Sequence, residues 1–171
     1  MGLYGIGFWL PSLIKASGIS NPVLVAIPYT AATIATVLTS RNSDRTGERR
    51  WHIALPALAG AAALVVSTLV PQTPTWAVLM LTIATVGIVT GLAQFWVLPP
   101  AFLGGAAAAA GIALINSIGN LAGFVSPFIV GWIKDATGST NNGLYVIAVS
   151  LAIGGAIVVA IAQRGTRRIA V

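Results

Sequence analysis

Long uncharged apolar runs dominate this chain of 171 residues. The four clearest runs are residues 53–70, 76–98, 105–133 and 144–162. As helices, which rise about 1.5 Å per residue, they are long enough to cross about 30 Å of hydrocarbon. Only 7% of the residues are charged, against roughly a quarter in a soluble domain. The sequence therefore predicts an all-α, polytopic membrane protein and excludes a soluble or a disordered domain.

Two further apolar runs are shorter. Residues 22–39 are rich in threonine and barely reach across a bilayer, but Asn21 can cap a helix there and Pro22 suits its first position. Residues 2–14 would extend only about 20 Å, and no basic region precedes them as in a signal peptide. This first segment fits either the last part of a transmembrane helix whose beginning is missing or a short interfacial helix.

The basic residues indicate the orientation in the membrane. Seven of the nine lie in two clusters, at residues 41–50 and in the tail at residues 163–171. Four expected spans separate the clusters, and an even number places both on one side. Because basic loops stay in the cytoplasm, we expect both segments to be cytoplasmic and Lys15 and Lys134 to lie opposite. The net charge of +6 thus reflects topology and not a nucleic-acid partner.

Residues for catalysis or metal binding are scarce. The chain has no cysteine, one histidine and three acidic residues, so we expect no metal site and no cofactor. No catalytic motif is present, and we expect no enzyme. Asp44, Glu48 and Asp135 all fall in expected loops, so no expected span carries a carboxylate for a proton relay.

The loop at residues 41–50 has an ordered pattern of charges. It contains Asp44, Arg45, Gly47, Arg49 and Arg50 in the order Asp-Arg-x-Gly-x-Arg-Arg. Asp44 can accept hydrogen bonds from Arg45 or from a helix N-terminus, and Gly47 permits a left-handed turn. A positive-inside stop signal is the simpler interpretation, although it does not require this order.

Two amides lie within one apolar run. Asn116 and Asn120 are four residues apart and share a helix face. Amides in hydrocarbon need a partner helix or a wet cavity, so interhelical bonding and ligand contact both remain open. Gly119 and Gly123 lie beside that face and are expected to allow close helix approach.

Other polar residues in the apolar runs have ordinary structural interpretations. Ser126 could satisfy a carbonyl freed by Pro127. The threonine stripe at Thr30, Thr33 and Thr36 favours packing. Trp96, just before two prolines, is typical of the interfacial belt.

Several motifs together resemble one known family. They are residues 4–11, 26–29, 43–45 with 48–52, 95–99, 107–123 and 131–138. With them the chain resembles the C-terminal half of a major facilitator superfamily transporter. The likeness is closest to the anion:cation symporter family, which carries organic acids such as sugar acids and tartrate.

The resemblance implies a six-helix half of a twelve-helix fold in the cell (inner) membrane. Its helices would be a truncated first one at residues 1–14, then 22–40, 52–70, 75–98, 105–133 and 143–162. The Asp44 loop would be the gating motif. Trp96 and Asn116 would line the central cavity and contact the organic anion, with Asn120 and Tyr4 as further candidates.

The implied partners are a small organic anion, a coupling cation, expected to be a proton, and the missing N-terminal half, where the family's coupling carboxylates belong. The chain departs from the family pattern in lacking that half, in a short run around Val25, and in Gly104 and Gly105, where a polar or basic residue is usual. The alternative is a truncated, non-transporting remnant or a membrane interaction module.

Overall fold

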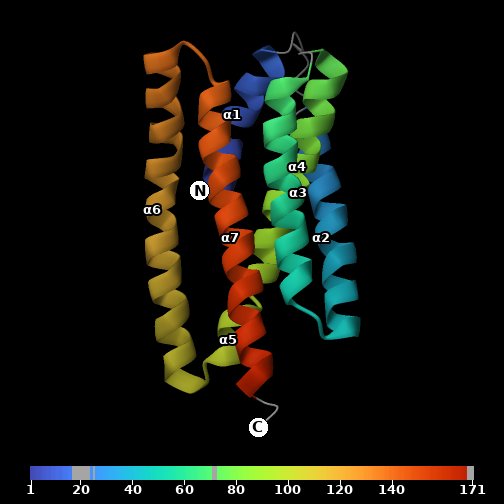
Figure 1. The fold of residues 1–171 in the computed structure, drawn as a ribbon, viewed down its shortest axis with the longest axis vertical. Helices are drawn as coiled ribbons and strands as arrows, with labels where there is room; N and C mark the ends of the chain where they lie inside the picture. The colour runs from blue at the N-terminus through green and yellow to red at the C-terminus, as the bar shows by residue number, and fades with distance from the viewer. Residues whose placement is uncertain (17–23, 25, 71–72, 169–171) are drawn as a thin grey trace.

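The computed structural model describes residues 1–16, 24, 26–70 and 73–168. Within these residues the chain folds into six long α-helices and one short one, without strands, as the sequence predicted. The long helices run roughly side by side (Figure 1). They are α1 (Gly2–Ala16), α2 (Ala26–Thr46), α3 (Arg50–Leu69), α4 (Pro74–Phe95), α6 (Gly105–Thr137) and α7 (Asn141–Arg168), with the short α5 (Leu98–Phe102).

Several helices are longer than expected. α2 continues to Thr46, so only residues 47–49 of the expected loop 41–50 are non-helical. α6 continues to Thr137, and α7 takes up most of the expected tail before ending at Arg168. Hydropathy marks where a span leaves the bilayer, whereas a helix ends only at a residue that breaks it. The expected cap at Asn21 and Pro22 lies outside the described residues.

Glycine and proline explain the ends of α2, α4 and α6. Gly47 follows α2 with φ +67°, and Gly138 follows α6 with φ +69°; a left-handed residue there favours glycine. The amide of Gly138 donates to the Lys134 carbonyl. α4 ends at Phe95, before the proline pair, and Pro99 and Pro100 instead form the start of α5, where a missing N–H is tolerated.

Four helical segments are long and apolar enough to cross a membrane. They are Arg50–Leu69, Pro74–Ala101, Gly105–Thr137 and Asn141–Ala160. Among the described residues, α1 is too short for this group and α2 ends in polar turns. The chain is therefore an integral, multi-pass membrane protein.

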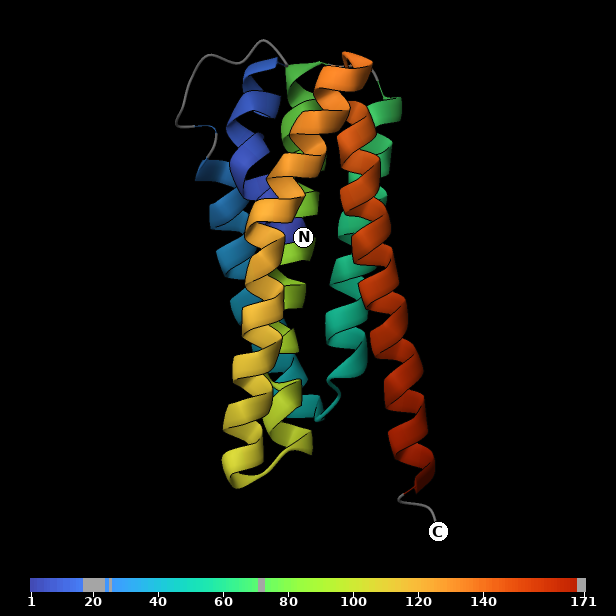
Figure 2. The ribbon, with the colours of Figure 1, turned by 90° about the vertical axis from the view of Figure 1, so that its left-hand side faces the viewer.

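α3 lies at the centre of the best-packed region and contacts α4 and α7 along much of its length. The two views of the ribbon show these helices adjacent (Figures 1 and 2). Gly87 of α4 lies so close to α3 that a Cβ there would come within 2.3 Å of the Pro56 carbonyl oxygen and 2.7 Å of Gly60 Cα. Small residues thus allow close backbone packing.

α1 packs into the bundle although it is short. Ile6, Leu10 and Ile14 repeat every four residues and are 0%, 0% and 1% exposed. They join a buried cluster with side chains of α3, α4 and α7, among them Leu64 and Ile147. α1 therefore packs inside the bundle through this face.

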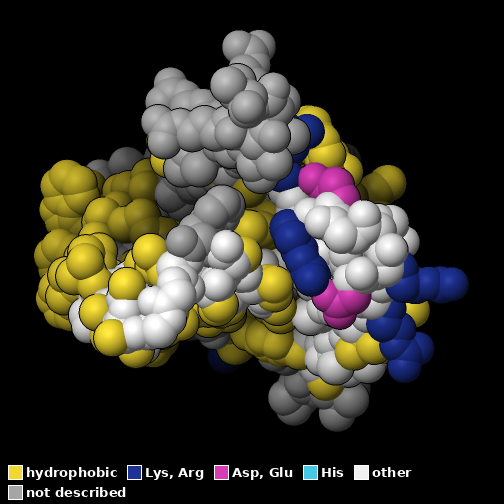
Figure 3. Space-filling view, turned by 90° about the horizontal axis from the view of Figure 1, so that it is seen from below, with side chains coloured by type: hydrophobic (Ala, Val, Ile, Leu, Met, Phe, Trp, Pro, Cys, Tyr) yellow, Lys and Arg dark blue, Asp and Glu magenta, His cyan; other side chains and the backbone are white. Residues whose placement is uncertain are grey.

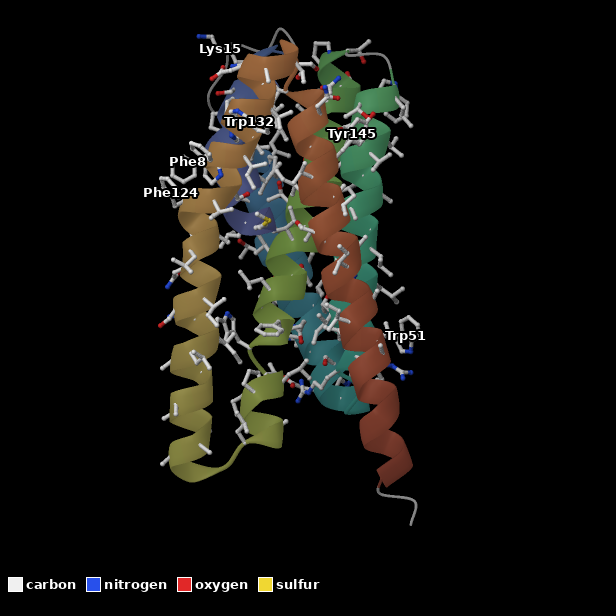
Figure 4. All side chains as sticks on the ribbon, turned by 60° about the vertical axis from the view of Figure 1, so that its left-hand side comes forward. Phe8, Lys15, Trp51, Phe124, Trp132 and Tyr145 are labelled. Atoms are coloured by element: carbon white, nitrogen blue, oxygen red, sulfur yellow. The ribbon has the colours of Figure 1, made fainter. Side chains whose placement is uncertain are left out.

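α6 is the least buried long helix among those described. Of its 33 residues, only Ser126 and Val130 are buried. Phe124 and Trp132 are 73% and 65% exposed and lie on the outer side of the bundle near Phe8 (Figure 4). Apolar exposure of this kind suits lipid or another transmembrane segment.

Candidate functional site

A cavity of about 640 Å³ opens between α1, α3, α4, α6 and α7. That size lies within the usual range for small-molecule sites. Its lining includes all four residues that the resemblance implies as substrate contacts, Tyr4, Trp96, Asn116 and Asn120. The structure thus brings together residues that lie more than 110 positions apart in the chain.

Tyr4 and Asn120 connect two helices across this cavity. The Tyr4 hydroxyl donates a 2.7 Å hydrogen bond to Asn120 Oδ1. Because the amide oxygen is the acceptor, the Asn120 Nδ2 group remains available to donate to a ligand. Asn120 therefore combines the two roles that its position left open, an interhelical bond and a cavity lining.

Asn116, unlike Asn120, lines the cavity without bonding to another helix among the described residues. Its side chain is exposed and lines the cavity, and no hydrogen bond joins it to another described side chain or backbone group. An amide offers two donors and two acceptor positions. Asn116 is thus free to bind a polar ligand from the same helix face as Asn120.

Aromatic rings form the apolar wall opposite. Trp96 lies in the turn after α4, half-buried, and its ring meets Phe95 edge-on with centroids 5.5 Å apart. The wall continues through Leu92 and Ile88 of α4. Trp96 therefore faces the cavity and does not serve only as an interfacial belt residue.

No lysine, arginine, histidine, aspartate or glutamate side chain lines the cavity within the described part of the chain. The cavity-lining side chains that can bond a ligand are neutral amides, hydroxyls and the Trp96 indole. Neutral donors can bind an anion's oxygens, but they leave its charge uncompensated.

The end of α2 and the start of α3 carry the predicted charge motif. Arg49 Nη1 forms an ion pair with Asp44 Oδ1 at 2.5 Å. The observed donor to Asp44 is thus Arg49, whereas the sequence had suggested Arg45 or a helix N-terminus. The buried Ser43 hydroxyl donates to the Glu48 carbonyl at 2.9 Å. Gly47 has the predicted left-handed conformation, which returns the chain so that Arg49 reaches Asp44.

Glu48 has a role that the sequence interpretation missed. Its two carboxylate oxygens accept the Trp51 amide at 3.1 and 2.9 Å, and one of them lies 3.1 Å from His52 Nδ1. Glu48 lies two residues before α3, and an acid close to a helix N-terminus is stabilised by the helix dipole, which favours this arrangement. Seen from below, acidic and basic side chains gather at this end of the molecule (Figure 3). Arg50 stacks over the Trp51 ring at 5.1 Å.

A buried polar contact between α2 and α4 was also missed. Gln94, 2% exposed, donates through Nε2 to Ser40 Oγ at 2.5 Å. One turn away, the hydroxyls of Thr36 and Thr90 lie 3.1 Å apart. The spacing of four in both helices could have indicated this pairing. Thr33 instead bonds the carbonyl of Tyr29 in its own helix.

Two expectations for α6 need correction. Ser126 does not satisfy a carbonyl freed by Pro127, because its hydroxyl donates to the Met1 carbonyl of α1 at 3.0 Å. Gly123 does allow close approach, since a Cβ there would lie 3.4 Å from the Tyr4 ring, but Gly119 has no described atom within 4 Å of that position.

The chain is similar to bacterial proteins named as transporters. It is 45% identical over 98% of its length to a "Putative tartrate transporter" of Agrobacterium vitis, of which it covers 38%. It is 37% identical over 98% of its length to the "Putative metabolite transport protein NicT" of Pseudomonas putida, of which it covers 39%. It is 34% identical over 92% of its length to the inner membrane transport protein RhmT of Escherichia coli, of which it covers 38%.

The chain thus spans less than half the length of the curated relatives it matches. No protein-family model matches it, and no solved structure gives a significant match. The relatives, the all-α fold and the partial coverage agree with the likeness found in the sequence. The chain is related to bacterial metabolite transporters and resembles the C-terminal half of a major facilitator superfamily transporter of the anion:cation symporter type.

Proposed function

We propose that this chain forms one side of the substrate site in a secondary active transporter for small organic anions. The observation that carries the proposal is the cavity in which Tyr4, Trp96, Asn116 and Asn120 meet. Relatives named for tartrate and metabolite transport support this substrate class. We propose no enzymatic reaction for this chain.

Each of these residues has a distinct proposed role. Asn116 and Asn120 donate hydrogen bonds to carboxylate or hydroxyl oxygens of the anion. Trp96 packs against its carbon chain. Tyr4 fixes the Asn120 amide through the 2.7 Å hydrogen bond, so that Nδ2 points to the ligand before binding.

The charge of the anion requires a second side. Neutral side chains line the described cavity, and Asp44 and Glu48 lie at the α2–α3 end. We therefore propose that the N-terminal half of the complete carrier supplies the cationic partner and the carboxylates for proton coupling. Carriers with repeated halves place the substrate between those halves.

The Asp44–Arg49 ion pair is proposed to act in gating. It joins the last turn of α2 to the residue before α3. A charge-assisted bond that forms in one state and breaks in another changes the balance between the two states of the carrier.

A chimera tests the proposed function. Residues 1–171 would replace the matching segment of the Agrobacterium vitis relative, and uptake of radiolabelled tartrate would be measured with and without a protonophore. We expect uptake that the protonophore abolishes. Asn116→Ala should raise KM about tenfold or more, because hydrogen bonds to charged groups contribute about 1.5–3 kcal/mol.

The matched control is Asn142→Ala, since Asn142 is an exposed amide of α7 that does not line the cavity. It should leave uptake unchanged. Normal uptake by both Asn116→Ala and Trp96→Ala, at equal amounts of protein in the membrane, would contradict the assigned site. An inserted chimera without uptake, beside an active parent protein, would support the remnant or interaction-module alternative.

A further inference from the structure

Six glycines line the cavity, and they fall into two groups. Four of them are packed against neighbouring atoms: a Cβ at any of these positions would lie 2.3–3.4 Å from another residue. These are Gly2, Gly87, Gly91 and Gly155. At Gly119 and Gly154 a Cβ would meet no described atom within 4 Å. Helix packing therefore explains the first group but not the second.

The two open glycines lie beside the polar groups of the cavity. Gly119 follows Asn116 by three residues and lies beside the helix face that Asn116 and Asn120 share, and all three residues line the cavity. Gly154 follows Ser150 by four residues on α7, and both line the cavity. A ligand held by these polar groups would thus lie against bare backbone on two helices.

Glycine is not favoured by the backbone at either position. Both residues lie inside helices, and neither has a positive φ. Glycine within a helix is less favourable than alanine by about 0.8–1.0 kcal/mol. Neither the backbone conformation nor a described neighbour requires glycine at these two positions. The effect that remains is the free volume that a missing side chain leaves in the cavity.

We propose that Gly119 and Gly154 set the upper size of the ligand that this cavity admits. The inference rests on the proposed function, because it concerns the same site. A methyl group at either position would project into the space that a longer organic acid occupies. Shorter acids would still fit, so the added methyl would change selectivity more than activity.

The first test concerns only whether the two positions face water, and it does not depend on transport. The chain has no cysteine, so Gly119→Cys and Gly154→Cys each provide a single thiol in the full chain in membranes. We expect both thiols to react with a small water-soluble methanethiosulfonate, since the thiolate needs water to form. Gly7→Cys is the control, because Gly7 is exposed and does not line the cavity, and a Cβ there would have only the Tyr29 hydroxyl oxygen within 4 Å, at 3.8 Å. Its thiol should react at least tenfold more slowly.

The second test measures size selection. The chimera with Gly119→Ala or Gly154→Ala would be assayed for kcat/KM with hydroxylated monocarboxylic acids of three to six carbons. One methylene in a pocket changes discrimination about 10- to 200-fold. We expect the ratio of the shortest to the longest acid to rise at least about tenfold, and Gly7→Ala to leave it unchanged.

The outcomes separate the two ideas. Equal loss of uptake for every acid would overturn the size-limiting role and indicate that these glycines pack against another segment. Unreactive thiols at both positions would overturn it as well. Reactive thiols in a chimera that transports no acid would support water-facing glycines and contradict the proposed function alone.

Discussion

α4 and α6 are both long and apolar, yet they are used differently. α4 buries nine of its 22 residues, whereas α6 buries two of its 33. Two polar groups of α4, Thr90 and Gln94, bond to α2, while Asn116 of α6 faces the cavity. In this chain α6, which is the least buried, supplies the amides proposed to bind substrate. α4, which is more buried, packs in the core of the bundle.

The largest expected effect separates a packed glycine from an open one. Gly87→Ala would place Cβ 2.3 Å from the Pro56 carbonyl oxygen, and overpacking of this kind reduces stability by about 3 kcal/mol. Gly119→Ala should change stability by no more than about 1 kcal/mol. Thermal unfolding in detergent would measure both. Equal stability of the two variants would remove the distinction between α4 and α6.

The two acids at the α2–α3 end provide a second contrast. Asp44 pairs with Arg49, whereas Glu48 caps α3. In the chimera, Asp44→Asn should slow uptake roughly tenfold without affecting insertion, because a charge-assisted bond is lost. Glu48→Gln keeps an oxygen for the cap and should have a smaller effect. A damaging Glu48→Gln with a silent Asp44→Asn would show that the motif is misaligned.

A smaller effect is expected for the buried amide of α4. Gln94→Leu removes the hydrogen bond to Ser40, and such bonds between membrane helices average about 0.6 kcal/mol, with a maximum near about 1.7 kcal/mol. Unfolding should detect this loss while tartrate KM stays unchanged. A KM shift as large as that of Asn116→Ala would assign Gln94 to the substrate site as well.

Single cysteines introduced to test the membrane orientation should change neither stability nor uptake. Thr46→Cys and Val171→Cys, each as the single cysteine, should be labelled only after the cytoplasmic side is opened, because arginine bias sets orientation. The structure places the α2–α3 turn and the end of α7 at the same end of the bundle, opposite Lys15 (Figures 1 and 4). Labelling of either thiol from outside intact cells would reverse the assigned orientation.

The sequence predicted the helices because their apolar runs are long and uncharged. Through the resemblance rather than through spacing, it also indicated Tyr4, Trp96, Asn116 and Asn120, which line one cavity in the structure; their contact with a substrate stays a prediction. It missed the partners of Asp44, Glu48 and Gln94, because these contacts depend on how α2 turns into α3 and on how α2 packs against α4. Helix ends were also misplaced where polar turns such as Arg41–Thr46 extend beyond the apolar run.

This chain is proposed to provide one side of the anion site and to need a second half for transport. Purified residues 1–171 and the chimera would be reconstituted side by side in liposomes with an imposed proton gradient and radiolabelled organic acids. We predict that the chimera accumulates tartrate and that residues 1–171 alone accumulate none, because alternating access requires two halves that move against each other. Accumulation by residues 1–171 alone, driven by the gradient and lost on Asn116→Ala, would contradict this account.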